Sequence, residues 1–82
     1  MPKLNTQELH ERLLKNDKLR ELVEYVYKIN GTSAARLNYR DAAKALNVAK
    51  NTIGAYVLKL VILEVFDVDD GTIKINTELF ED

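Results

Sequence analysis

The amino-acid sequence predicts a mainly α-helical fold that ends in a β-hairpin. Apolar residues recur at helical spacing through most of the chain, and a turn signal, Asp70-Gly71, then separates two short alternating stretches. At 82 residues the chain has the length of one domain, so we expect a single domain over residues 1–82. With 46% hydrophobic and 30% charged residues, it has the composition of a globular protein.

The composition excludes several classes of function. The absence of cysteine excludes disulfides, thiol catalysis and cysteine-ligated zinc. No apolar run approaches the length of a membrane span, and the first residues lack the apolar stretch of a signal peptide, so we expect a cytoplasmic protein with no membrane partner. His10 is the single histidine and the three glycines are scattered, so we predict no enzyme, no catalytic residue, no metal site and no cofactor.

The formal net charge of -1 hides a gradient along the chain. Residues 32–60 carry five basic residues against a single acid, Asp41. Residues 61–82 carry seven acidic residues against a single base, Lys74. Segregated charge of this kind is compatible with polyanion binding by the basic segment, and the alternative is an ordinary solvated surface.

Residues 6–30 are predicted to form one bent helix or a pair of helices. Asn5 and Glu8 have the spacing of a capping box at the start of the first segment. Asn16 and Asp17 interrupt the apolar pattern, and we expect Asp17 to be the N-cap of a second segment. That segment is expected to end at Asn30-Gly31.

The N-terminal segment also contains three leucines in a short stretch, which could be buried in the core or at an interface. Leu9, Leu13 and Leu14 suggest an interface, and we predict a homodimer that places this helix between two copies. The alternative is a monomer in which these leucines complete a small core.

Residues 39–63 are predicted to form two helices joined by a three-residue turn. Asn38 is the expected cap of a helix over Tyr39–Leu46, and Asn47–Ala49 is the expected turn. A second helix from about Lys50 to Leu63 presents one apolar face, formed by Ile53, Val57 and Leu60. Two helices joined in this way make a helix-turn-helix.

Residues 64–76 are predicted to form a hairpin around a type I′ turn. Its register pairs Val68 with Ile73 and Phe66 with Ile75, which places these four side chains on one apolar face. An acidic tail over residues 77–82 follows, in which Leu79 and Phe80 are expected to cover the core.

Six residues in and around the predicted turn carry a family pattern: Ala43, Leu46, Asn47, Val48, Thr52 and Ile53. With them the chain resembles the winged helix-turn-helix family, in the form of a small bacterial, archaeal, plasmid or viral transcriptional regulator. Ala49 departs from the pattern, because a capping serine is usual there. The resemblance implies a three-helix core with an N-terminal helical extension, and residues 64–76 as the wing.

The resemblance also implies sequence-specific binding of double-stranded DNA, with the helix over residues 50–63 in the major groove. Asparagine and threonine side chains can read base edges, whereas lysine and arginine suit phosphates. Leu58 and Ile62 point away from the core side of the same helix. The candidate DNA-contacting residues are Arg40, Lys44, Lys50, Asn51, Thr52, Ala55, Tyr56 and Lys59.

The predicted wing tip is acidic, since it consists of Asp69, Asp70 and Gly71. Carboxylates next to phosphates are repelled, so we expect this wing not to grip DNA and to be available to a protein partner. The alternative function is therefore a winged-helix protein–protein adaptor in a transcription, replication or partition complex.

Overall fold

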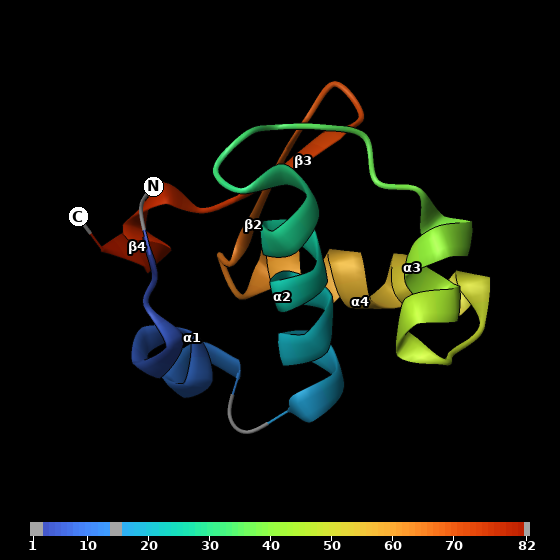
Figure 1. Cartoon of the computed structure of the whole chain (residues 1–82), viewed down its shortest axis with the longest axis horizontal. Coiled ribbons are helices and arrows are strands. Elements are labelled where there is room, and N and C mark those ends of the chain that lie inside the picture. The colour runs from blue at the N-terminus through green and yellow to red at the C-terminus, as the bar shows by residue number, and fades with distance from the viewer. Residues whose placement is uncertain (1–2, 14–15, 82) are drawn as a thin grey trace.

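The computed structural model describes residues 3–13 and 16–81, which form four helices, a hairpin and a small terminal sheet (Figure 1). The chain runs through β1 (Lys3–Leu4), α1 (Thr6–Leu13), α2 (Asp17–Asn30), α3 (Tyr39–Leu46), α4 (Lys50–Ile62), β2 (Phe66–Asp69), β3 (Thr72–Ile75), the 3-10 helix η1 (Thr77–Leu79) and β4 (Phe80–Glu81). The predicted mainly helical fold with a C-terminal hairpin is confirmed.

Residues 6–30 form a pair of helices, and each begins at an asparagine. The Asn5 side chain accepts a hydrogen bond from the Glu8 backbone N–H at 3.0 Å, which is half of the predicted capping box. The other half is not formed, because the Asn5 N–H donates to the Leu79 carbonyl at 2.7 Å. The Asn16 side chain accepts one from the Leu19 N–H at 3.2 Å. The prediction that Asp17 caps α2 is wrong by one residue, because Asn16 has the extended backbone of a cap and Asp17 is already helical.

The two helices α3 and α4 are joined by the predicted turn. Asn38 caps α3 by accepting from the Asp41 N–H at 3.0 Å, and Asn47 ends α3 in the left-handed conformation, with φ 57° and ψ 50°. Ala49 precedes α4 without a side-chain cap, as expected for alanine. The helix ends at Ile62, one residue before the predicted end.

The hairpin β2–β3 has the predicted register, with Phe66 opposite Ile75 and Val68 opposite Ile73. Only Val68 departs from the predicted apolar face, because 49% of it is exposed. The reason is the position of its strand. β3 is flanked on its other side by Ala35, which exchanges two backbone hydrogen bonds with Ile73, at 3.1 and 2.9 Å. β2 is therefore the outer strand, and less of the molecule covers it.

One hydrophobic core gathers side chains from all four helices, the hairpin and η1. It includes Leu9 and Leu13, whose exposed fractions are 0% and 3%. The prediction that these two leucines form a dimer interface is therefore wrong, because their apolar surface is already buried within one chain. They complete the core, which was the alternative. Leu14 lies outside the described residues.

The acidic tail also belongs to the fold. Leu79 is buried, and the ring of Phe80 lies 5.8 Å from the ring of Tyr27 on α2. β4 then pairs antiparallel with β1, so both ends of the described chain lie side by side (Figure 1). The tail covers the core as predicted. Its pairing with the N-terminal strand was not predicted, because no local sequence pattern indicates it.

A single arginine joins α1 to the C-terminal end of α4. Arg12 donates to the Glu64 backbone carbonyl at 2.9 Å, and its guanidinium contacts the carboxylates of Glu8 and Glu78 at 3.2 and 3.3 Å. Burial lowers the pKa of Arg12, but the hydrogen bonds to Glu8 and Glu78 and the negative charges of these two residues together raise it by more, so the pKa lies above its ordinary value. The guanidinium therefore stays charged and fixes the chain where α4 ends.

Candidate nucleic-acid interface

α3 and the first half of α4 lie together at one end of the molecule, opposite the terminal strands (Figure 1). The Lys18 ammonium on α2 donates to the Leu46 carbonyl at 3.0 Å and so holds the C-terminal end of α3 against α2. The Asn47 turn sets the path from α3 into α4. The surface formed by α3, the turn and α4 thus has a fixed geometry.

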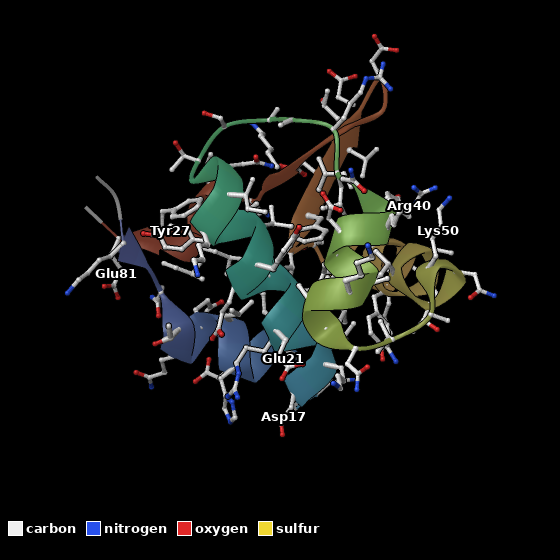
Figure 2. All side chains as sticks on the ribbon, turned by 45° about the vertical axis from the view of Figure 1, so that its right-hand side comes forward. Asp17, Glu21, Tyr27, Arg40, Lys50 and Glu81 are labelled. Carbon is white, nitrogen blue, oxygen red and sulfur yellow. The ribbon has the colours of Figure 1, made fainter. Side chains whose placement is uncertain are left out.

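Four cations of this surface are exposed: Arg40, Lys44, Lys50 and Lys59. None of them makes an ion pair with another residue that the structure describes, whereas Arg12, Lys18 and Arg20 elsewhere do. Arg40 and Lys50 project from the same side of the molecule (Figure 2) and line one shallow depression with residues 37–39 and Asp41. The cations are therefore available to an anion outside the chain.

The remaining predicted contact residues divide between the outer face and the flanks of α4. Asn51 and Ala55 are exposed, and Thr52 and Tyr56 are half-buried. Tyr56 packs its ring against the core, as expected for a residue between the two faces. The exposure of these side chains therefore agrees with their positions around the helix, as helical periodicity predicts.

The N-terminus of α4 adds a positive potential of its own. No side chain caps it, and its first turn contains no acidic residue. The unpaired backbone N–H groups and the helix dipole both favour an anion at such an end. Lys50, the first residue of α4, adds a full charge at the same place.

Leu58 and Ile62 lie on the outside of α4, with exposed fractions of 63% and 71%. No other part of the described chain covers these two side chains, so both meet solvent. They extend the outer face of α4 beyond Ala55 as an apolar stripe.

Sequence reasoning missed Arg36, which lies at the tip of the hairpin β2–β3. Its guanidinium Nη1 is 3.0 Å from the position that a Cβ on Gly71 would occupy. The pairing of Ala35 with Ile73 brings Arg36 there, across a separation of more than thirty residues. No local pattern carries a signal for a contact that depends on this pairing. The positive charge of Arg36 offsets part of the negative charge of Asp69 and Asp70 at this tip.

The described residues contain no group of three or more histidine, cysteine, aspartate or glutamate side chains placed to hold a metal ion. No helix in the described part of the chain is long and apolar enough to cross a membrane. The basic surface of α3 and α4 is thus the strongest candidate for function.

Comparison of the chain with protein-family models, with curated proteins and with solved structures found no match. The functional conclusion therefore rests on the geometry and charge of the surface itself.

Proposed function

We propose that the chain is a winged helix-turn-helix protein. The support is the order of its elements: helix α2, the extended contact at Ala35, helices α3 and α4, and the hairpin β2–β3 that pairs with Ala35. In this proposal α4 is the recognition helix and the hairpin is the wing. The helix α1 is the N-terminal extension, packed into the same core.

The proposed function is sequence-specific binding of double-stranded DNA, as a transcriptional regulator. The observation that carries it is the set of exposed cations around α4, which make no ion pair within the described chain. Duplex DNA is a dense row of negative charge, and an unpaired basic surface around one exposed helix suits it. The helix is then inserted in the major groove, where an α-helix fits.

The roles of the side chains follow from their chemistry and place. Arg40, Lys44, Lys50 and Lys59 are assigned to phosphates. Asn51 and Thr52, in the first turn of α4, are assigned to base edges, because the first residues of a recognition helix reach deepest into the groove. Ala55 and the Tyr56 hydroxyl flank them.

The oligomeric state belongs to the same proposal. A homodimer would read two half-sites about one helical turn apart, but Leu9 and Leu13 cannot form its interface, since they are core residues. The alternative function, a protein adaptor, draws support from the acidic wing, in which Asp67, Asp69 and Asp70 are all exposed.

The test is fluorescence anisotropy with a mixed-sequence duplex over a salt series. We expect affinity to fall steeply as salt rises, and Lys50→Ala or Lys59→Ala to flatten the slope of log K against log salt by about one unit each. The matched control is Lys3→Ala, an exposed lysine on β1 at the opposite end of the molecule, which leaves the slope unchanged. Undetectable binding at low salt would overturn the proposal and favour the adaptor.

A further inference from the structure

The outer face of α4 carries an apolar stripe to which the proposed DNA contacts assign no role. Of the four large hydrophobic residues that are exposed in the described chain, two lie on α4: Leu58 and Ile62. They are one turn apart, and Ala55 and Asn51 continue the same line toward the N-terminus, at helical spacing. The stripe is opposite the buried face of Ile53, Val57 and Leu60. It therefore faces whatever α4 binds.

The charge of α4 itself favours one occupant over another, although the exposed acid Glu64 follows soon after its last residue. α4 contains two lysines, Lys50 and Lys59, and no acidic residue. A second copy packed on this face about a two-fold axis would bring the lysines of two such helices together. A DNA major groove instead offers phosphates to the lysines and one apolar group to the stripe, the C5-methyl of thymine.

We propose, on the basis of the DNA binding proposed above, that Ala55, Leu58 and Ile62 contact thymine methyl groups and make the chain selective for A·T-rich sites. From Asn51 to Ile62 the helix rises about 16 Å, the length of roughly five base pairs. Asn51 at the start of this line suits adenine, with which asparagine forms two hydrogen bonds. Both ends of the line thus favour the same base pair.

Deoxyuridine tests this contact, because it keeps the hydrogen-bonding groups of thymine and lacks only its methyl group. Anisotropy at low salt compares an alternating A·T duplex of about 20 base pairs with the same duplex carrying deoxyuridine at every thymine. We expect the wild-type chain to bind the thymine duplex more tightly, by about fourfold for each methyl group contacted. A G·C duplex with 5-methylcytosine should likewise be preferred to its unmethylated form, since the added methyl occupies the same groove.

Two variants separate direct contact from the effect of methyl groups on DNA shape. Leu58→Ala with Ile62→Ala should lose most of the preference for thymine over deoxyuridine, because its two large contacting side chains are shortened and only alanine methyl groups remain on the stripe. Ile29→Ala, which shortens an exposed isoleucine on α2, should keep it. Both changes are at exposed positions, so circular dichroism is expected to show folded protein in each case.

The outcomes distinguish this inference from the proposal on which it rests. Salt-dependent binding with equal affinity for thymine and deoxyuridine duplexes overturns the methyl contact and leaves DNA binding standing. An undiminished preference in the Leu58→Ala, Ile62→Ala variant also overturns it. So does light scattering that finds a wild-type dimer and a monomeric variant, because the stripe would then be an interface between copies. Absence of binding to every duplex overturns both proposals.

Discussion

Gly54 and Gly71 differ in whether the fold could accept a side chain at their positions. Gly54 lies within α4, where a Cβ would be 3.6 Å from Tyr39 Cε2, an ordinary van der Waals distance. No backbone of another element lies within 4 Å of that position. Gly71 has φ +79°, and a Cβ there would be 3.0 Å from Arg36 Nη1. Only the second position requires glycine.

We therefore predict that Gly54→Ala stabilises the chain and Gly71→Ala destabilises it. Alanine at position 54 should raise the free energy of unfolding by about 0.5–1 kcal/mol, because it reduces the backbone entropy lost on folding. Alanine at position 71 should lower it by about 1–2 kcal/mol, since the left-handed conformation disfavours a side chain. Thermal unfolding followed by circular dichroism measures both. A lower Tm for Gly54→Ala would reveal a packing restraint at Tyr39 that the distance does not indicate.

At the scale of elements, the helix-turn-helix and the hairpin carry opposite charge. The cations of α3 and α4 are unpaired within the described chain, whereas β2 and the turn after it expose Asp67, Asp69 and Asp70. The guanidinium of Arg36 lies near the tip of the hairpin, and Lys74 is opposite Asp67. If α4 binds DNA, the acidic hairpin is not a second DNA contact. Its carboxylates repel nearby phosphates and so weaken the binding at low salt.

The prediction at this scale is that Asp69→Asn together with Asp70→Asn strengthens duplex binding at low salt by about twofold to fivefold, because repulsion from nearby phosphates is removed. Asparagine tolerates the left-handed φ of 50° at position 70, so the turn is kept. Glu11→Gln with Glu81→Gln makes the same change of charge on α1 and β4 and should have no effect. Equal affinities for wild type and the wing variant would place the wing well away from the DNA.

At the scale of the whole molecule, α1 and the tail complete the core of a small domain. Leu9 and Leu79 are both fully buried, and Arg12 connects α1 to Glu64 and Glu78. The pairing of β1 with β4 closes the two ends of the described chain against each other. The buried leucines of the N-terminal helix thus belong to the core of one chain.

It follows that Leu9→Ala should act on folding and not on assembly. We expect it to lower the free energy of unfolding by about 2–5 kcal/mol, the usual cost of emptying a buried leucine site. Leu58→Ala, at an exposed position, should change it by less than about 0.5 kcal/mol. Urea unfolding at two protein concentrations tenfold apart measures both effects. If the urea midpoint of the wild type rises with protein concentration and that of Leu9→Ala does not, the result would support a dimer interface at Leu9.

Most of the helical and hairpin structure could be predicted because its causes are local. The Asn38 cap, the left-handed Asn47 and the Asp70-Gly71 turn are decided by the chemistry of a few neighbouring residues. The register of the hairpin followed from its turn and from alternation, and the orientation of α4 side chains followed from helical periodicity. The candidate surface was predictable to the same extent, since all of its residues lie within one continuous segment.

What the sequence alone determined, then, is the identity of the elements, the direction of their side chains and the concentration of positive charge between residues 32 and 60. Only the tertiary structure decided that Leu9 and Leu13 are core, that Ala35 flanks β3, that Arg36 reaches the hairpin tip and that β1 pairs with β4. These contacts join residues far apart in the chain. Burial and pairing at such distances depend on how the helices pack together, and no local pattern of residues contains that information.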